Sequence, residues 1–190
     1  LSDDIFLKTL QARFPQTPVK KIYQPWSASS MIFPWITRLV WGDIDLKWFP
    51  EANISHPTHK GFYTVGEYTV REPMPGSNIR NIYLWAGISH EGIKDSLLSP
   101  LAVADTLSRL SLETLNGLKA LPSRKSSDFS EMNQMLADME SFAHIGNYYA
   151  AKIRAACHLA LFDRYADQSD KNKAVAYLKE AKLYWAQYAS

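Results

Sequence analysis

The sequence has few of the features by which common functional classes are recognised. It has one cysteine, Cys157, so no disulfide can form within the chain. It has no apolar run of the roughly 18 to 20 residues that a membrane span needs, and no signal-peptide pattern. Lys and Arg total 21 against 19 acidic residues, and the two signs are interspersed. The sequence therefore predicts no membrane span and no nucleic acid as a partner, because nucleic-acid binding needs a basic patch or stripe.

Motifs of cofactor and catalytic sites are also missing. The chain has no GxGxxG, P-loop, paired CxxC, HExxH or GxSxG sequence. His56 and His59 have metal-binding chemistry, but Pro57 prevents a regular helical pair. Only Glu51 or His90 offers a third ligand. We therefore predict no cofactor and no metal site, and we assign no catalytic residue.

Helical periodicity is the main positive signal. Pro25 and Pro34 interrupt the second apolar pattern and predict either a kinked helix or two abutting helices there. Ser99-Pro100 is a favoured cap-and-proline order, and Asp170 is a candidate cap for the last helix. The apolar residues at helical spacing predict helices over these ranges: 3–14, 19–41, 100–118, 129–165 and 170–188.

Residues 42–96 have a different composition. Four prolines and six glycines interrupt the region, and no helical period is sustained in it. The sequence GFYTVGEYTV at 61–70 is rich in β-branched and aromatic residues and predicts a short hairpin. An irregular segment of this length is expected to be functional, packed on its own aromatics or shaped to meet another domain. We therefore predict a mainly α fold, a bundle of about five or six helices with a long irregular excursion over 42–96.

The C-terminal end has a recognisable local pattern. The two helices around the turn at 167–171 resemble a tetratricopeptide-type hairpin, and AVAYLKEAKLYWAQY matches its alternation of small and large residues. No second copy occurs near a period of ~34 residues, so no repeat array is predicted. We predict that 1–190 is a single helical domain. Because Leu1 is not an initiator Met and Ser2 already suits a helix cap, we expect the domain to be cut from a longer multidomain protein.

Three reactive side chains of the long predicted helix have structural explanations. Cys157 lies within a helical pattern, where a small buried thiol is the ordinary interpretation. His144 and His158 lie in the same helix, and we expect both to be hydrogen-bonded at helix–helix contacts. We expect none of the three to act on a ligand.

One segment carries the strongest signal for function. The sequence WGDIDLKWFPE places Trp41 and Trp48 beside Asp43, Asp45 and Glu51. Indole rings stack on the C–H faces of a pyranose, and carboxylates accept hydrogen bonds from its hydroxyls. We therefore predict that these five residues bind a carbohydrate.

Two other interpretations of this segment remain open. In the first, its rings pack in an aromatic core, while its carboxylates bind loop amides or pair with Arg38 or Lys47. In the second, Asp43, Asp45 or Glu51 supplies the acid and base of a self-contained glycoside hydrolase, whose two carboxyls lie roughly 5 to 10 Å apart. Spacing within one loop does not separate these alternatives.

Several segments together resemble a known class of proteins. They are SDDIFLKTLQARFP, PWSASSMIFPWITRLVWGDIDLKWFPEA, GNYYAAKIRAACHLALF and YLKEAKLYWAQY. In this order they resemble the C-terminal helical part of large bacterial glycoside-hydrolase-like proteins, of a type similar to α-glucuronidases. The resemblance implies an upstream (β/α)-barrel that carries the catalytic carboxylates and packs against the helical part. It also implies a carbohydrate partner, such as an acidic oligosaccharide, and a periplasmic or extracellular location.

Besides the self-contained glycoside hydrolase described above, which we rank lowest, two functional hypotheses follow. The leading one is an accessory helical domain of a carbohydrate-active enzyme, which borders or buttresses a polysaccharide-binding cleft through the segment from Trp41 to Glu51. It requires Trp41 or Trp48 to be partly exposed near a carboxylate. The alternative is a protein-interaction module that uses the groove between the two C-terminal helices, and it requires that groove to be open and apolar.

Overall fold

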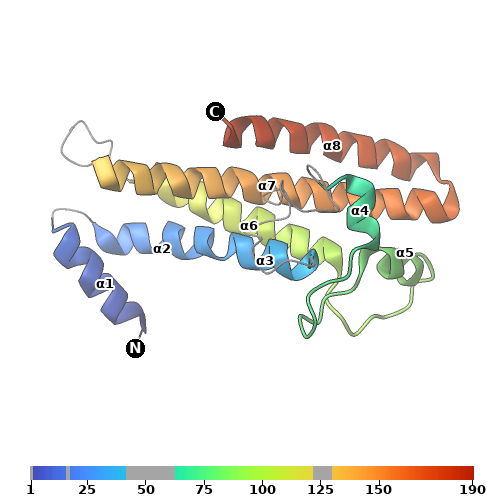
Figure 1. Cartoon of the computed structure of the whole chain (residues 1–190), viewed down its shortest axis with the longest axis horizontal. Helices are drawn as coiled ribbons and strands as arrows, with labels where there is room; N and C mark the ends of the chain where they lie inside the picture. Colours follow the sequence, from blue (N-terminus) through green and yellow to red (C-terminus); the bar gives the residue numbers. More distant parts are fainter. Residues whose placement is uncertain (1, 16–17, 42–62, 122–129) are drawn as a thin grey trace, which may run out of the picture.

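The computed structural model describes residues 2–15, 18–41, 63–121 and 130–190. These residues form eight helices and no strand, which confirms the mainly α fold (Figure 1). The count exceeds the five or six that we expected, because the region 42–96 contributes two helices and one predicted helix is divided. The helices are α1 (Ser2–Arg13), α2 (Val19–Ser30), α3 (Ile32–Leu39), α4 (Val65–Val70), α5 (Ile82–His90), α6 (Pro100–Lys119), α7 (Ser130–Tyr165) and α8 (Gln168–Tyr188).

The long helix α7 is the centre of the bundle. It packs against α8 on one side and against α6 on the other, and α6 in turn packs against α2 and α3 (Figure 1). The short helices α4 and α5 also pack against α7. None of the described helices has both the length and the apolar content needed to cross a membrane.

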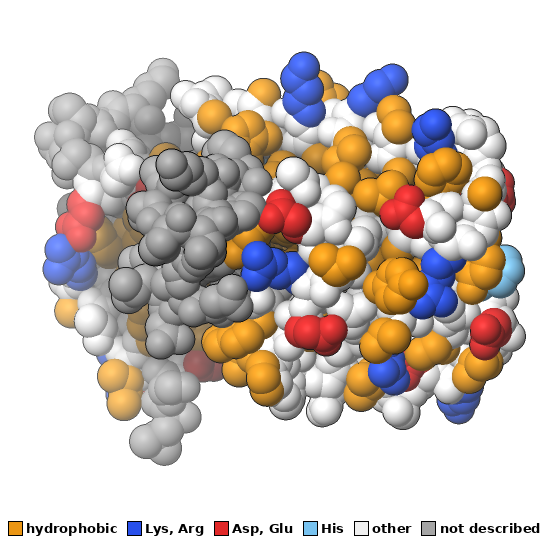
Figure 2. Space-filling view, turned by 45° about the vertical axis from the view of Figure 1, so that its right-hand side comes forward, with side chains coloured by type: hydrophobic (Ala, Val, Ile, Leu, Met, Phe, Trp, Pro, Cys, Tyr) orange, Lys and Arg blue, Asp and Glu red, His pale blue; other side chains and the backbone are white. Residues whose placement is uncertain are grey.

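Two apolar clusters fill the interior. The larger one joins α3, α6 and α7, and it contains Ile36, Leu107 and Tyr149. The smaller one ties α1 and α2 to the beginning of α7, through Phe14, Ile22 and Met132 among others. On the face shown in Figure 2, charged side chains of both signs lie among hydrophobic ones, as the interspersed charges of the sequence predict.

The prolines divide the predicted helix over 19–41 into two. Helix α2 ends at Ser30 and α3 begins at Ile32, so the alternative of two abutting helices is correct. Pro34 lies in the first turn of α3, where a missing backbone N–H is harmless. Pro25 lies inside α2, and a Cβ placed on Gly117 of α6 would come within 2.8 Å of its ring. The absence of a side chain at Gly117 therefore allows α2 and α6 to approach.

Helices α6 and α7 approach each other in a similar way. A Cβ on Gly146 would overlap Oγ of Ser111 and lie 3.1 Å from Cδ1 of Ile32. Ser111 is fully buried, and its Oγ has no hydrogen-bond partner among the described residues. The crossing of α6 and α7 is therefore set by a glycine that faces a buried hydroxyl.

The predicted hairpin over 61–70 is wrong for the described part of that range. Residues 65–70 form α4, which begins at a capping box. The Glu67 N–H donates to Thr64 Oγ1 at 3.3 Å, and the Thr64 N–H donates to the Glu67 carboxylate at 2.5 Å. This reciprocal pair satisfies two backbone donors at the helix start, and it outweighs the β-propensity of the neighbouring residues.

The turn between α7 and α8 also differs from our expectation. Asp167, rather than Asp170, caps α8, and its carboxylate accepts a hydrogen bond from the Ser169 N–H at 2.8 Å. Asp170 lies in the first turn and contacts His158 Nδ1 of α7 at 2.8 Å. The expected hydrogen bond of His158 at a helix–helix contact is confirmed. Both side chains are about one-sixth exposed, which keeps this pair largely out of water.

The other two reactive side chains of α7 follow the prediction in part. Cys157 is fully buried, as expected, and burial raises the pKa of its thiol. His144 does not follow the expectation, because its Nδ1 is buried without a hydrogen-bond partner among the described residues. Its Nε2 lies 4.0 Å from Glu140, one turn earlier on the same helix.

A backbone bridge and an ion pair close the loop around α5, and we call them together the clasp. Ile79 and Leu98 form an isolated parallel bridge, and the Arg80 guanidinium donates to both carboxylate oxygens of Asp95 at 2.7 and 2.8 Å. Asp95 also accepts a hydrogen bond from the Leu97 N–H at 3.0 Å. The hydrogen bonds from Arg80 and then Leu97 lower the pKa of Asp95 to about 2. The clasp therefore depends on an ionised carboxylate.

Asp95→Asn is expected to destabilise the protein at neutral pH and to flatten the pH dependence of its stability. The folded pKa of Asp95, about 2, lies below the ordinary value of 3.8. The contribution of the ionised Asp95 to the free energy of unfolding is thus complete above about pH 4, and it is lost as the pH falls toward about 2. Urea unfolding between pH 2 and 7 measures this contribution as the difference between wild type and variant.

Glu113→Gln is the matched control for the clasp, because Glu113 forms an exposed ion pair with Arg109 one turn away on α6. We expect this variant to follow the wild-type curve at every pH. A constant stability difference between wild type and Asp95→Asn from pH 4 to pH 2 would show that ionisation of Asp95 does not support the clasp.

Candidate functional site

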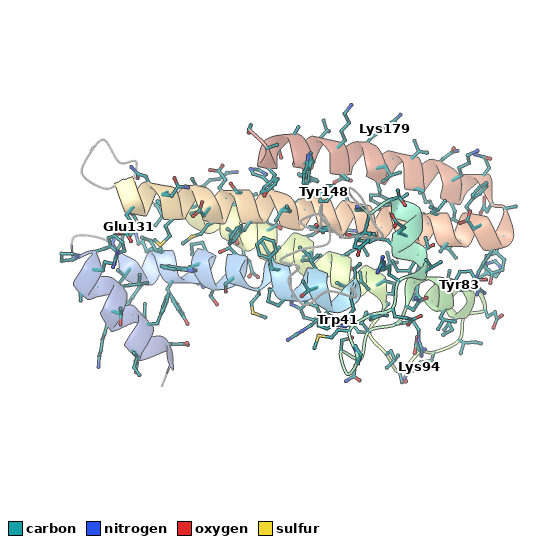
Figure 3. The ribbon with its side chains drawn as sticks, in the orientation of Figure 1. Trp41, Tyr83, Lys94, Glu131, Tyr148 and Lys179 are labelled. Atoms are coloured by element: carbon teal, nitrogen blue, oxygen red, sulfur yellow. The ribbon has the colours of Figure 1, made fainter. Side chains whose placement is uncertain are left out.

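The structure describes one of the five predicted carbohydrate-binding residues. Trp41 follows the end of α3, and its side chain is 43% exposed (Figure 3). Its backbone N–H donates to the Glu72 carbonyl at 3.2 Å, which holds this point of the chain against the loop after α4. The other four predicted residues, Asp43, Asp45, Trp48 and Glu51, lie outside the described residues. The same is true of His56 and His59.

The residue that follows this region, Tyr63, is firmly placed. It is buried, and its carbonyl accepts a hydrogen bond from Lys152 Nζ at 2.6 Å. The Arg71 guanidinium lies over its ring, with Cζ 4.2 Å from the ring centroid. Tyr63 is therefore held to α7 through Lys152.

A groove lies at this position between α7 and α8, and we call it the α7–α8 groove. It has a volume of about 300 Å³. On α7 its side chains are one turn apart, and on α8 they recur at helical spacing, so both sets face the same space. The residues that line it are Tyr63, Tyr148, Lys152, Leu178, Ala181, Lys182 and Trp185.

Aromatic rings form one wall of the groove. The centroids of Tyr148 and Trp185 lie 5.0 Å apart with an interplanar angle of 56°, and Tyr148 is labelled on α7 in Figure 3. Tyr188 follows one turn later on α8, 5.2 Å from the Trp185 ring. Tyr148 and Trp185 are partly exposed. Ring surface is therefore available to a ligand at the groove.

Two lysines give the groove a positive charge. Lys152 is 5% exposed, and its Nζ donates to Tyr148 Oη at 3.2 Å as well as to the Tyr63 carbonyl. It also lies 4.5 Å from the centroid of the Tyr68 ring. Lys182 is exposed at the rim. Among the described residues that line the groove there is no Asp or Glu, so the exposed ammonium group of Lys182 favours an anionic group at the rim.

The groove residues were not predicted from the sequence. The run YYAAK contains Tyr148 and Lys152, and it was noticed only as part of a family resemblance and of an apolar helical stripe. A lysine within a stripe of small apolar residues was the available signal, because a buried lysine needs specific partners. In the described ranges, no three His, Cys, Asp or Glu side chains are grouped as metal ligands would be.

Comparisons with known proteins add no relative. No protein-family model, no curated protein and no solved structure matches this chain.

Proposed function

We propose that this chain is an accessory helical domain of a carbohydrate-active enzyme and that its α7–α8 groove binds an acidic saccharide. One observation carries the proposal: the neighbouring rings of Tyr148 and Trp185 lie beside the lysines of the same groove. Aromatic faces and cations together match the C–H faces and the carboxylate of a uronic acid residue.

In this proposal each kind of side chain has a separate role. The exposed surface of Trp185 and Tyr148 stacks on the sugar ring, and Lys182 at the rim pairs with the sugar carboxylate. Lys152, held between Tyr148 and the Tyr63 carbonyl, fixes the floor of the groove and adds positive charge. The volume of about 300 Å³ lies at the small end of ligand sites, so the groove holds a short part of a chain.

Of the five residues of the predicted segment, Trp41 is the one that the structure describes, and it is partly exposed. The carboxylates that the prediction places beside it lie outside the described residues. An upstream domain of the same chain supplies the catalytic carboxylates.

Trp185→Ala is expected to weaken the binding of an acidic oligosaccharide about tenfold. The loss of one aromatic stacking partner costs about 1.4 kcal/mol, which corresponds to this factor. Lys182→Ala is expected to weaken binding a few-fold and to reduce its dependence on salt, because an exposed ion pair is weak and screened. Isothermal titration calorimetry with a glucuronic-acid-containing oligosaccharide measures both effects.

Leu183→Ala serves as the control, since Leu183 is 66% exposed on the same helix but does not line the groove. Equal affinities for Trp185→Ala and Leu183→Ala would remove the groove from the proposal. Loss of binding in all three variants would instead point to a general weakening of α8.

The openness of the groove also favours a second function, a protein-interaction module. Leu178 is 37% exposed, and with Ala181 it forms an apolar strip between the two C-terminal helices. Such a strip accommodates one side of an amphipathic helix. If an amphipathic helical peptide bound here and an acidic saccharide did not, this alternative would replace the first.

A further inference from the structure

A second hollow lies on the other side of the bundle, between α1 and α2. Helix α1 packs against α2 (Figure 1), and Leu10 of α1 and Phe14 just after it are buried in the smaller apolar cluster. The N-terminal half of α1 borders a hollow of about 380 Å³. We call this the α1–α2 hollow, and the residues that line it are Asp3, Phe6, Tyr23, Trp26, Ser27 and Ser30.

Three rings enclose this hollow at angles to one another. The Phe6 and Trp26 centroids lie 5.0 Å apart at 78°, and the Phe6 and Tyr23 centroids lie 5.7 Å apart at 53°. Phe6 is 37% exposed, and Tyr23 and Trp26 are partly exposed. The rings thus leave part of their surface open to a small molecule.

Polar groups surround the same rings. The Tyr23 hydroxyl donates to the Asp3 carboxylate, and this hydrogen bond raises the pKa of Tyr23. The Ser30 hydroxyl donates to the Ser27 carbonyl at 2.8 Å, which leaves the lone pairs of Ser30 Oγ as acceptors. Ser27, whose side chain is also a hydroxyl, lines the hollow as well. Each of these groups can exchange hydrogen bonds with a ligand hydroxyl.

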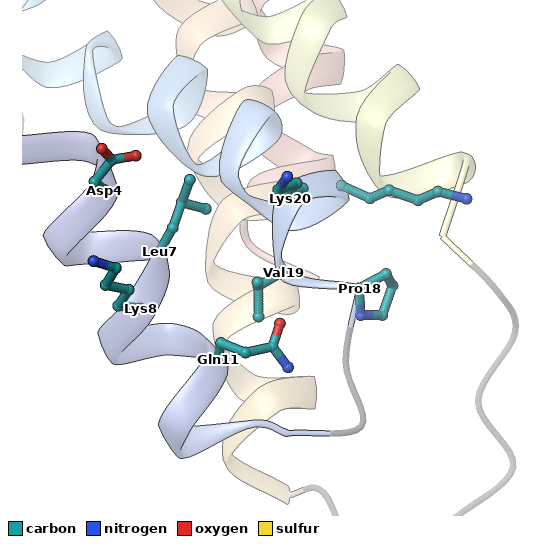
Figure 4. Close-up of a pocket in the computed structure, with 8 residues that line it drawn as sticks. Asp4, Leu7, Lys8, Gln11, Pro18, Val19 and Lys20 are labelled. Atoms are coloured by element: carbon teal, nitrogen blue, oxygen red, sulfur yellow. The ribbon is translucent and has the colours of Figure 1, made fainter.

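The neighbouring hollow on α1 does not have this combination of aromatic rings and polar groups. Another flank of α1 and the start of α2 enclose about 550 Å³, which Figure 4 shows in close-up. Leu7, Pro18 and Val19 lie along it together with lysines, and none of the described residues that line it is aromatic. The larger hollow therefore lacks the ring faces on which a sugar stacks.

We infer that the α1–α2 hollow binds a neutral pyranose, as a saccharide site separate from the α7–α8 groove. Rings for the C–H faces and hydroxyl and carboxylate oxygens for the sugar hydroxyls are both present in it. Asp3 is the one charged side chain among the described residues that line the hollow. Its carboxylate repels the carboxylate of a uronic acid, so we expect the ligand to be neutral. The inference stands on its own residues and does not depend on the function of the groove.

Phe6→Ala is expected to weaken the binding of a neutral oligosaccharide, such as xylotetraose, about tenfold in calorimetric titration of the whole chain. Ser27→Ala is expected to weaken it about threefold, because it removes one neutral hydrogen bond. Ser27 is exposed on α2, so its truncation reports on the ligand even if Phe6→Ala loosens α1. Gln11→Ala, in the larger hollow, is expected to leave the affinity unchanged.

The charge of the hollow gives a second measurement. Asp3→Asn retains a hydrogen-bond acceptor but removes the charge, and it is expected to admit a glucuronic-acid oligosaccharide to the hollow. The groove variant Trp185→Ala serves as background here, because its roughly tenfold weaker binding at the groove lets a new site for the acidic saccharide be detected.

Two results would overturn the inference. One is the absence of binding of the neutral oligosaccharide to the wild-type chain at about 10 mM. The other is binding that Phe6→Ala and Ser27→Ala do not weaken more than Gln11→Ala does. Either result leaves the acidic saccharide and Trp185 test untouched, so the two proposals fail separately.

Discussion

Gly146→Ala is expected to destabilise the protein by about 2 kcal/mol. The added Cβ overlaps Ser111 Oγ and presses on Ile32, at a crossing where three helices meet. Overpacking of a core costs up to about 3 kcal/mol, and the better helix propensity of alanine returns about 1 kcal/mol. Urea unfolding followed by circular dichroism measures the net loss.

Ser111→Ala is expected to have the opposite effect and to rescue the first variant. Its Oγ is buried without a partner in the described structure, so its removal stabilises the fold by about 1 kcal/mol. In the double variant the overlap with the new Cβ is gone. We therefore expect a coupling energy of up to about 3 kcal/mol between the two positions, which is the overpacking cost that the double variant avoids.

Gly66→Ala provides the control for this cycle. Gly66 also lies within a helix, but the nearest atom to a Cβ there is Thr64 Oγ1, at 3.9 Å. Without an overlap, the gain in helix propensity dominates and the variant is expected to be slightly more stable. Additive effects of Gly146→Ala and Ser111→Ala would refute the close crossing as the reason for the glycine.

Lys152→Met is expected to destabilise the protein by about 2 kcal/mol. The variant keeps the length of the side chain but loses the donor to the Tyr63 carbonyl and to Tyr148. Hydrogen bonds to charged groups contribute about 1.5 to 3 kcal/mol, and the buried carbonyl of Tyr63 loses its partner. Hydrogen exchange at residues 63–71 measures the release of this segment, together with urea unfolding.

An increase in stability in Lys152→Met would also have a physical explanation. Exchange of a buried charge for an apolar side chain can raise stability when desolvation exceeds the interactions of the charge. A more stable Lys152→Met would therefore show that Lys152 is kept for its charge in the groove and not for the fold. Lys182→Met is the control, because this exposed lysine of the same groove is expected to leave stability unchanged.

Local signals predicted most of the helices. The expected range 100–118 corresponds to α6 at Pro100–Lys119, because Ser99 and Pro100 mark its start within a few residues of chain. The expected range 129–165 corresponds to α7 at Ser130–Tyr165, where the apolar stripe is sustained over many turns. Both helices need only neighbours in the sequence to be recognised.

Two predictions from local sequence are wrong because a different hydrogen bond forms in the structure. In 61–70 the β-propensity of the aromatic and β-branched residues predicts strands, but the capping box from Thr64 to Glu67 starts a helix. Asp170 was assigned as a cap, but His158 of α7 takes its carboxylate. That second contact crosses from one helix to the next, so no local pattern announces it.

The α7–α8 groove shows where prediction from the sequence ended. Trp185 and Lys152 lie on different helices, and only the packing of α8 on α7 brings their side chains to one space. The sequence directed attention to indoles next to carboxylates within one segment. It did not reveal that Lys152, four residues after Tyr148, would be buried against the Tyr63 carbonyl.

The contact of Gly117 with the Pro25 ring has a consequence for sequence variation. Like the pair of Gly146 and Ser111, it joins a glycine on one helix to a particular side chain on its neighbour. A larger residue in place of either glycine is tolerated when the facing side chain becomes smaller. The two positions of each pair are therefore expected to covary among homologues, with helix spacing preserved while the residues that set it change.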